Sequence, residues 1–439
     1  MSTSSSSSTS LSDAESDSST VVYDHEPFNT FHSRVLNFAL HKIWPDAAPD
    51  EISVERMAGG GYNRVIGISR QPAEHPGIQI RYIIRIPRFS DARVDTQAAT
   101  LRLVNQYSKI PVPTVVCFDQ ADDNELGSRY MVQHRVPGTS LLSSYPRLAH
   151  NERCRIAREL GRAYRELLST RSDAPGFLTI PADSTAPCQF LPWQYTELAW
   201  ARELNDLLTP PDIHQMEMDM LLPWQRLNPA PTEEYSHAFS SRPIDEMLID
   251  IFMAQKATEL RHRQKSLTRL HIMDRFCNMA SELAAGGWFA NCHLSLAHLD
   301  LAPRNILANP TYDAEEPIIS AVLDWDSAVI APQFMCSTPP VWIWTWLNDD
   351  DNDDDDDDDE YDDERMANQE PPTPEGRQLK QLFEEAAGPD YARFAYTPAY
   401  QLARRLVRFS MEGLYSNESI EEAEALLAEW ELPVMSNWV

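Results

Sequence analysis

The sequence predicts an α+β protein with two lobes, a small strand-rich lobe followed by a larger helical one. Between residues 51 and 138, stretches rich in β-branched and aromatic residues are separated by Gly and Pro turns, which is typical of strands. From residue 139 onward, apolar residues recur mainly at helical spacing. With 439 residues, of which 42% are hydrophobic, the chain can bury a core of this size. We therefore expect the small lobe over 25–138 and the helical lobe over 139–439.

The small lobe is expected to contain several strands and one helix. A helix is predicted at Asp95–Tyr107, because Ala98, Leu101 and Val104 recur at helical spacing. One strand is closed by Pro87, which cannot donate to a hydrogen-bonded ladder. The expected strands are Glu51–Met57, Val65–Ser69, Ile80–Ile86 and Tyr130–Gly138, and the last of them leads out of the lobe.

The helical lobe is predicted from apolar spacing in segments spread over most of its length. The clearest helices are Glu152–Leu168 and Pro398–Tyr415, and further helical segments are expected between 245 and 285. A middle stretch, 190–227, is rich in Trp, Pro and Leu and is predicted to be helical with breaks. Short strands are expected to return at Asn305–Ala308 and Ile318–Leu323.

The formal net charge of −30 is concentrated in one acidic run. Residues 349–364 contain twelve Asp and two Glu, which leaves a net charge of −16 on the rest of the chain. A net acidic protein is poorly suited to nucleic acid, because phosphate contacts need clustered Lys and Arg. Blocks of like charge repel one another, so a solvated, disordered insertion is predicted over 348–374 within the helical lobe. An alternative is that the run attracts a cationic substrate or partner.

The N-terminal segment and the apolar runs predict a protein of the cytoplasm. The first 24 residues are rich in Ser and Asp, which predicts a disordered tail rather than a secretory signal or a usual transit peptide. The longest near-continuous apolar run, Val341–Leu347, is far shorter than the ~20 residues that span a bilayer. The six cysteines lie far apart without a C-x-x-C pair, which argues against a zinc site or a disulfide framework.

The segment His298–Asn305 carries the strongest functional signal. It has His, Asp, Leu and Asn at the offsets found in the catalytic loop of kinases. Asp300 is expected to take a proton from an acceptor hydroxyl, and Asn305 to bind a magnesium ion on nucleotide phosphates. His298 is expected to brace the loop through hydrogen bonds. Taken singly, an Asp and an Asn at this spacing are more often a turn or capping pair.

A second acidic motif and a glycine turn strengthen this hypothesis. Asp324 follows an apolar run, and a carboxylate at a strand end can hold a divalent cation that bridges phosphates. Asp326 is a weaker candidate for the same role. A glycine turn between two predicted strands lets backbone N–H groups approach phosphate oxygens, although such a turn alone is more often a flexible hairpin. Its members are Gly59, Gly60 and Gly61.

These motifs resemble those of the aminoglycoside phosphotransferase and choline kinase branch of the protein-kinase-like superfamily. The likeness is greatest to fungal-type members of the phosphotransferase enzyme family, and it runs in order over 51–328. It rests chiefly on His298–Ile306, which matches H-x-D-L-x-x-x-N-I, and on Leu323–Asp326, which matches a hydrophobic residue followed by D-W-E/D. Shorter matches are Arg85–Pro87, Ile110–Pro113 and Pro137–Gly138.

The resemblance implies a protein-kinase-like fold of two lobes. It also implies that ATP and magnesium are used and that the γ-phosphoryl group is transferred to a hydroxyl. By the same resemblance, Asp300 would be the base, and Asn305 and Asp324 would be the metal ligands. Nucleotide contacts would come from the glycine turn and from Arg85, Gln133 and Arg135.

Two departures from the family pattern concern the nucleotide. No Lys lies between Lys42 and Lys109, so Arg85 takes the place of the usual third-strand Lys. Arg carries the same charge but differs in reach and geometry. Gln97, two residues after Asp95, stands where a Glu normally pairs with that Lys. Gln97 can accept a hydrogen bond from Arg85 but cannot neutralise its charge.

A third departure lies in the catalytic loop and leaves other functions open. Ala302 replaces a polar or basic residue that helps to bind the γ-phosphate, a role that Arg304 could take instead. A catalytically weak or inactive binding module of kinase fold is therefore the main alternative. A protein kinase is less favoured, because no A-P-E signature follows Asp324. The intact set of Asp300, Asn305 and Asp324 favours a small-molecule kinase.

The acceptor is expected to be a small molecule with a hydroxyl group, similar to an aminoglycoside, choline or a sugar. In the family it is held by the helical lobe, which corresponds here to 190–296. The acidic chain favours a cationic acceptor. Four Trp residues of this region could form a cation–π cage, although Trp in amphipathic segments mostly packs in a core. They are Trp193, Trp200, Trp224 and Trp288.

Overall fold

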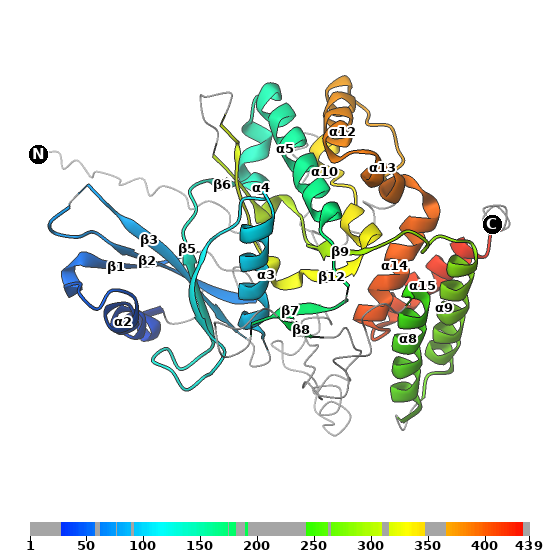
Figure 1. Ribbon diagram of the computed structural model, residues 1–439, viewed down its shortest axis with the longest axis horizontal. Helices are drawn as coiled ribbons and strands as arrows, with labels where there is room; N and C mark the ends of the chain where they lie inside the picture. The colour runs from blue at the N-terminus through cyan, green and yellow to red at the C-terminus, as the bar shows by residue number, and fades with distance from the viewer. Residues whose placement is uncertain are drawn as a thin grey trace, which may run out of the picture. The chain divides into compact units, whose positions relative to one another are not determined.

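The computed structural model in Figure 1 describes most of both predicted lobes. Several predicted features lie outside the described residues: the N-terminal tail, the glycine turn Gly59–Gly61, nearly all of 190–227 and the acidic run 349–364. The described ranges are 28–57, 62–75, 77–88, 92–173, 175–180, 189–191, 243–261, 265–309, 316–346 and 366–432.

The chain divides by its internal contacts into two compact units. Unit 1 comprises residues up to 90 together with 121–132, and unit 2 comprises 91–120 together with 133–439. Unit 1 contains three antiparallel strands in sequence order, with a fourth strand beside the third. These are β1 (Ile52–Arg56), β2 (Asn63–Arg70), β3 (Ile80–Pro87) and β5 (Tyr130–His134). Only the first three residues of β5, up to Val132, belong to unit 1.

The core of unit 1 forms because isoleucines alternate along β2 and β3. Ile66 pairs with Ile84 across the two strands, and both side chains are buried. α2 (Phe28–Phe38), which continues into the π-helix η1 (Ala39–Ile43), packs against β1. Phe38 meets the ring of Tyr130 edge-on, with 4.8 Å between ring centroids. The short 3-10 helix η2 (Pro49–Glu51) leads into β1.

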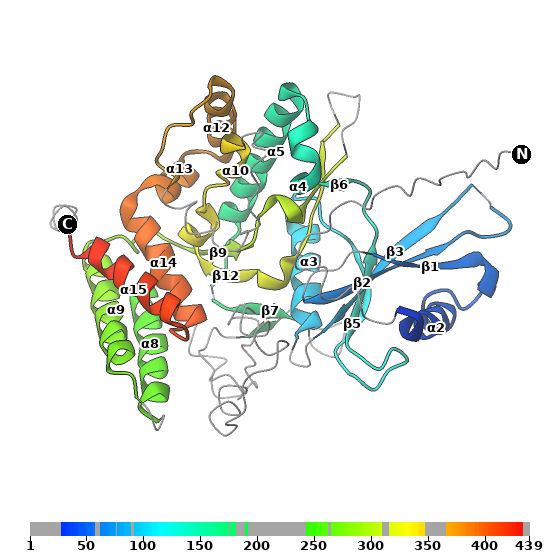
Figure 2. The same cartoon turned by 180° about the vertical axis from the view of Figure 1, so that it is seen from behind.

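Unit 2 is built mainly of helices (Figures 1 and 2). α5 packs along α12, and α8 packs along α9, with α14 and α15 against α9. The longer helices are α3 (Val94–Tyr107), α5 (His150–Ser169), α8 (Ile244–Arg261), α9 (Leu267–Ala285), α12 (Pro374–Ala387), α13 (Pro389–Tyr396), α14 (Pro398–Glu412) and α15 (Asn417–Trp430). The shorter ones are α4 (Leu141–Ser144), η3 (Tyr145–Arg147), η6 (Pro303–Asn305), η7 (Trp325–Ser327), η8 (Gln333–Ser337) and α10 (Trp342–Thr345).

α5 and α12 cross at backbone contact. A β-carbon added at Gly161 would lie 2.5 Å from the carbonyl oxygen of Phe383, so only glycine fits at this crossing. Tyr164 lies one turn further along α5 and meets the Phe383 ring edge-on at 5.1 Å. The two helices therefore form a fixed pair within unit 2.

Short antiparallel strands lie between these helices and carry the candidate catalytic segments. β9 (Leu294–Ala297) pairs with β12 (Val329–Pro332). β10 (Ile306–Ala308) pairs with both β11 (Ile319–Val322) and β6 (Thr139–Ser140). The remaining strands of unit 2 are β4 (Val115–Asp119), β7 (Phe177–Thr179) and β8 (Gln189–Leu191).

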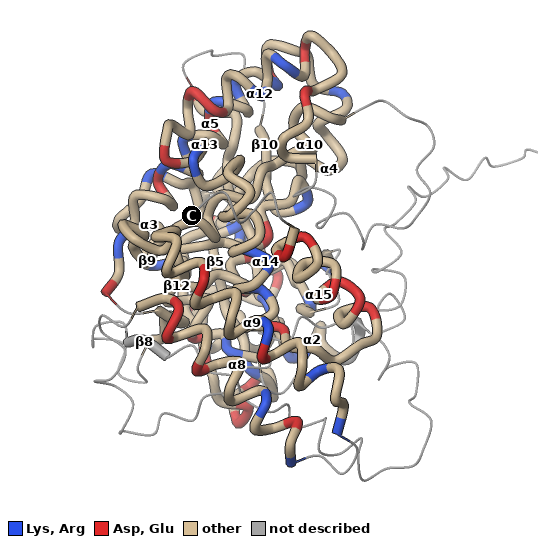
Figure 3. The backbone as a smooth tube through the Cα atoms, turned by 90° about the vertical axis from the view of Figure 1, so that its right-hand side faces the viewer, with Lys and Arg blue, Asp and Glu red and all other residues tan. Residues whose placement is uncertain are grey.

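Charges of both signs are distributed along the helices of unit 2 (Figure 3). α15 has five Glu and no basic residue. Its acidic face is held by arginines of neighbouring helices. Arg275 of α9 donates to Glu424 at 2.7 Å, and Arg405 of α14 donates to Glu429 at 2.7 Å. None of the described helices is long and apolar enough to cross a membrane.

The predicted α+β class is confirmed, as are the main predicted helices and strands. The helix predicted to reach Tyr415 ends earlier, at Glu412, because Gly413 adopts a φ of 80° that breaks the helix. The strand predicted to reach Gly138 ends at His134. Past Pro137, which has no N–H to donate, the chain passes so close to β10 that a β-carbon at Gly138 would lie 3.0 Å from the Ala308 carbonyl oxygen.

Candidate active site

Two loops of unit 2 lie side by side because of the strand pairing around them. The first loop runs from the end of β9 through η6 into β10, and it contains the segment His298–Asn305. The second runs from the end of β11 through η7 into β12, and it contains Asp324. Because β9 pairs with β12 and β10 with β11, both ends of the two loops are aligned. The Leu323 N–H donates directly to the Asn305 carbonyl oxygen at 2.7 Å.

His298 joins the two loops from inside the protein. It is 1% exposed, and its Nε2 lies 2.9 Å from the Leu323 carbonyl oxygen while the Asp300 N–H donates to its Nδ1 at 3.3 Å. A carbonyl only accepts and a backbone N–H only donates, so the proton of the ring is on Nε2 and the ring is neutral. Burial lowers the pKa of His298, which favours the same neutral form. The ring also packs edge-on against Trp325 at 4.5 Å.

Asp300 is held by one partner on each carboxylate oxygen. Asn305 Nδ2 donates to Oδ2 at 2.7 Å, and Arg304 Nη2 donates to Oδ1 at 2.7 Å. The same Asn305 nitrogen also donates to the backbone carbonyl oxygen of Asp300 at 3.1 Å. An ionised carboxylate has about four lone-pair sites, so Asp300 can still accept a proton from a hydroxyl.

Asp324 occupies a left-handed backbone conformation at the end of β11, with φ 59° and ψ 59°. Asp and Asn adopt this conformation more readily than other non-glycine residues. Leu299 in the other loop has a φ of 64°, so both loops contain a backbone conformation that costs free energy. The turn after Asp324 is anchored by Trp325, whose Nε1–H donates to the Val322 carbonyl oxygen at 3.0 Å.

The donor atoms of these loops suit magnesium. The Asn305 amide nitrogen donates to Asp300, which leaves its oxygen Oδ1 for a cation, and Asp324 supplies a carboxylate. Magnesium prefers oxygen ligands and usually takes one or two carboxylates together with substrate phosphates and water. Within the described ranges no cluster of three or more His, Cys, Asp or Glu could hold a metal by itself.

Two residues that the sequence did not identify position these loops. Ser140 Oγ lies 3.3 Å from the Pro303 carbonyl oxygen and 3.2 Å from that of Arg304. Glu159 of α5 accepts hydrogen bonds from the N–H groups of Ile318, which precedes β11, and of Ile319, the first residue of β11. The Val322 N–H, at the other end of β11, donates to the Pro111 carbonyl oxygen at 2.8 Å. β11 is therefore fixed at both ends, and Asp324 lies two residues beyond it.

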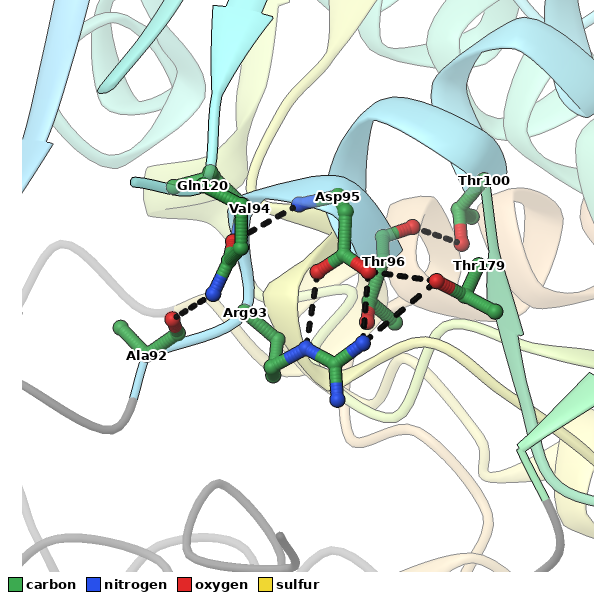
Figure 4. A network of polar contacts seen from close by, with 8 residues as sticks. All are labelled: Ala92, Arg93, Val94, Asp95, Thr96, Thr100, Gln120 and Thr179. Carbon is green, nitrogen blue, oxygen red and sulfur yellow. Dashed lines mark hydrogen bonds and ion pairs between the residues drawn. The ribbon is translucent and has the colours of Figure 1, made fainter. Parts of the chain in front are cut away.

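The first turn of α3 contains a buried polar network (Figure 4). Arg93 donates to both oxygens of Asp95, at 2.8 and 2.6 Å, and Thr179 Oγ1 donates to Oδ2 at 2.5 Å. Burial raises the pKa of Asp95, but the hydrogen bonds from Arg93 and Thr179 outweigh it and lower the pKa below its usual value. Gln120 Oε1 accepts from the N–H of Val94 and so caps the helix. In the sequence Asp95 lies near the position of the family's Glu. In the structure its carboxylate is hydrogen-bonded to Arg93 and Thr179, which both belong to unit 2.

The other predicted nucleotide-binding residues lie on both units. Arg85 is a half-buried residue of β3 in unit 1, opposite Val65. Gln133 is buried on β5, and Arg135 follows that strand and is half-buried. Gln97 lies on α3 and is 4% exposed, and its Nε2 has no hydrogen-bond partner among the described residues.

Trp288 packs with other aromatic side chains. Its ring meets the Tyr400 ring edge-on, with 5.6 Å between centroids. The guanidinium of Arg393 lies over the Tyr400 ring and donates to the Tyr400 hydroxyl at 2.7 Å. The Trp288 side chain itself is half-buried. The other three Trp candidates, at 193, 200 and 224, lie outside the described residues.

Known proteins resemble the chain over different lengths. A subtelomeric hrmA-associated cluster protein of Aspergillus fumigatus, found in two strains, is 27% identical over 135 residues, which cover 30% of this chain and 25% of that protein. The chain therefore matches about a quarter of the length of these curated relatives.

Solved structures resemble the chain over most of its length. A Plasmodium vivax ethanolamine kinase shows 12% identity, covers 94% of this chain and 91% of its own, and has a TM-score of 0.48. A thermostable mutant of an aminoglycoside phosphotransferase, bound to AMP-PNP and hygromycin B, shows 12% identity, covers 91% and 99%, and has a TM-score of 0.44.

The family model "Phosphotransferase enzyme family" matches residues 69–335, which is more than half of the chain. The match contains β3, α3, the loop of Asp300 and the loop of Asp324. It confirms the predicted family. The chain belongs to the phosphotransferase enzyme family.

Proposed function

We propose that this protein is a kinase that uses ATP and magnesium to phosphorylate a hydroxyl group of a small molecule, with Asp300 as the base. The observation that carries the proposal is the double hydrogen bond from Asn305 to Asp300, at 2.7 and 3.1 Å. It orients the carboxylate of the base and leaves the amide oxygen of Asn305 for a cation. The hydrogen bond between Leu323 and Asn305 keeps the loop of Asp324 beside this pair.

In the proposed reaction Asp300 accepts the proton of the acceptor hydroxyl. The hydroxyl oxygen forms a bond to the γ-phosphorus of ATP, the bond from that phosphorus to the β–γ bridging oxygen breaks, and ADP leaves. Magnesium, when bound by Asn305 and Asp324, would neutralise charge on the phosphate oxygens. His298 takes no part in proton transfer, because both of its ring nitrogens are hydrogen-bonded within the loops.

The nucleotide is proposed to contact the glycine turn Gly59–Gly61 and the side chains or backbone of Arg85, Gln133 and Arg135. The acceptor is proposed to be small and cationic, because the chain is acidic. A catalytically weak binding module remains the second candidate. Gln97 favours it, since a neutral amide stands where the family has a carboxylate.

The first experiment measures the melting temperature of the purified protein with ATP, with magnesium and with both. A ligand that binds only the folded state at 100 times its dissociation constant adds about 2.7 kcal/mol to the free energy of unfolding. We expect the full rise only when ATP and magnesium are present together. Absence of any rise at millimolar ATP would contradict nucleotide use and favour the binding module.

The second experiment tests the base. Asp300→Asn should retain the rise with ATP and magnesium but lose turnover by about 10²–10⁴-fold, which is typical of removing a general base. The acceptors to screen are aminoglycosides, choline, ethanolamine and sugar alcohols, with ADP release as the readout. The matched control is Asp173→Asn, at an exposed position, which should keep full turnover. Normal turnover of Asp300→Asn would exclude Asp300 as the base.

A further inference from the structure

Arg304 is the exposed partner of the base. Its Nη2 lies 2.7 Å from Asp300 Oδ1, and the side chain of Arg304 is 60% exposed whereas that of Asp300 is 24% exposed. The other oxygen of Asp300 is held by Asn305, which is 7% exposed. The carboxylate thus has one buried partner and one partner on its solvent side.

The backbone of Arg304 is fixed although its side chain is exposed. Ser140 Oγ lies 3.2 Å from the carbonyl oxygen of Arg304 and 3.3 Å from that of Pro303. Pro303 restricts its own φ, and η6 is closed by the Asn305 N–H donating to the Ala302 carbonyl oxygen at 3.0 Å. A change in the position of the guanidinium therefore requires only rotation of the side chain.

The ion pair is weak enough to exchange its partner. Exposed pairs four residues apart stabilise proteins little, because solvent screens them and ordering the side chain costs entropy. Within the described part of the chain, Arg304 donates only through Nη2, so Nε and Nη1 are available to another acceptor. A phosphoryl group offers several charged oxygens, and the planar guanidinium fork binds such groups through two donors at once.

We infer that Arg304 exchanges Asp300 for the phosphoryl group that is transferred. This inference rests on the proposed function. When the terminal phosphate of the nucleotide enters, the guanidinium turns to its oxygens and leaves Asp300 Oδ1 open to the acceptor hydroxyl. One side chain thereby screens the base before the phosphate arrives and binds the phosphate afterwards. Ala302, which has no polar atoms in its side chain, cannot supply this contact.

The exchange predicts discrimination between nucleotides. ADP lacks the phosphoryl group that Arg304 would bind, so only a triphosphate should gain from the guanidinium. The probe is AMP-PNP, which keeps the terminal phosphate and resists transfer, and ADP is the reference. Calorimetric titration in magnesium measures both dissociation constants without any acceptor.

The variants are Arg304→Met, Arg304→Lys and the control Arg408→Met. Arg408 also forms an ion pair with a residue four positions away, Glu412, but it lies on α14. We expect Arg304→Met to bind AMP-PNP about tenfold more weakly, the loss of roughly one charged hydrogen bond, with ADP affinity unchanged within about twofold. Arg304→Lys should recover part of the loss, and Arg408→Met should bind both nucleotides as the wild type does.

Three outcomes would contradict the inference. If Arg304→Met weakens AMP-PNP and ADP equally, or neither, while the wild type binds both, Arg304 does not contact the terminal phosphate. If Arg304→Lys is no better than Arg304→Met, the loss does not come from the charge. If the wild type binds neither nucleotide, the proposed function fails and this inference fails with it.

Discussion

Asn305 holds Asp300 through a single amide nitrogen, which donates both to the carboxylate oxygen Oδ2 at 2.7 Å and to the backbone carbonyl oxygen at 3.1 Å. The side chain and the backbone of Asp300 are thereby fixed by one residue five positions further along the chain. An arrangement of this kind restricts the rotamer of the carboxylate before any ligand binds, which is the preorganisation that proton transfer requires.

Asn305→Ala should therefore impair the base as well as the metal site. Both hydrogen bonds to Asp300 are lost, and so is the amide oxygen proposed to bind magnesium. We expect turnover to fall by about 10²-fold or more. The rise in melting temperature that needs ATP and magnesium together should also shrink. Turnover within about twofold of the wild type would show that Asp300 does not depend on Asn305.

Two substitutions of Asp324 distinguish the effect of its negative charge from the effect of its left-handed backbone conformation. Asp324→Asn keeps a residue that tolerates the left-handed conformation at φ 59°, whereas Asp324→Ala does not. Both variants should lose magnesium-dependent nucleotide binding. Only the alanine variant should also lose about 1–2 kcal/mol of unfolding free energy, as measured by denaturant titration. A magnesium requirement that survives in Asp324→Asn would reject Asp324 as a metal ligand.

Glu159 should stabilise β11 from α5. Glu159→Ala leaves the N–H groups of Ile318 and Ile319 without their acceptor, and an unsatisfied buried donor costs about 1–3 kcal/mol. Glu159→Gln keeps one acceptor oxygen and should lose less. Glu166→Ala is the control on the same helix, since among the described residues the Glu166 side chain has no hydrogen bond or ion pair. Equal melting temperatures for the two alanine variants would contradict this role.

The stability of the protein should fall as the pH drops below about 6.5, in part because of His298. Burial lowers the pKa of His298 below its usual value, so as the pH falls the unfolded chain takes up a proton before the folded protein does. Above the pKa that His298 has in the unfolded chain, the ring is neutral in both states and the free energy of unfolding does not depend on its protonation. As the pH falls through and below that pKa, protonation of the unfolded chain lowers the free energy of unfolding. His298→Asn should therefore show a smaller drop in melting temperature between pH 7.5 and 5.5 than the wild type.

The control for the pH measurement is His75→Asn, which changes an exposed residue of unit 1. It should retain the pH dependence of the wild type. A His298→Asn protein whose melting temperature falls as steeply as that of the wild type would show that His298 does not contribute.

The sequence predicted the elements whose own residues carry a periodic pattern. The alternation of Ile66, Ile68, Ile84 and Ile86 reflects one buried face, and all four side chains are buried. β9 and β12 were not predicted, because they pair with each other across more than thirty residues of the chain and β12 ends in Pro332. A pairing between strands so far apart leaves no local pattern in the sequence.

The candidate site was predictable where its residues are close in sequence. His298, Asp300 and Asn305 lie within one loop, so their spacing is visible in the chain itself. The supports were not predictable, because Ser140 reaches a carbonyl 163 residues away and Glu159 an N–H 159 residues away. A hydrogen bond from a side chain to distant backbone leaves no local pattern. The direction of the Arg304 side chain likewise required the structure.

The crossing of α5 and α12 at Gly161 bears on where the chain can tolerate a change in its length. Residues 347–365 begin after α10 and end before α12. On one side Tyr145 Oη donates to the Ile343 carbonyl oxygen at 2.7 Å, and on the other α12 is fixed to α5 by the contact of Gly161 with Phe383. Both ends of this stretch are therefore held by contacts that its own residues do not make. A change in the number of residues between 347 and 365 should leave α10, α5 and α12 in their places.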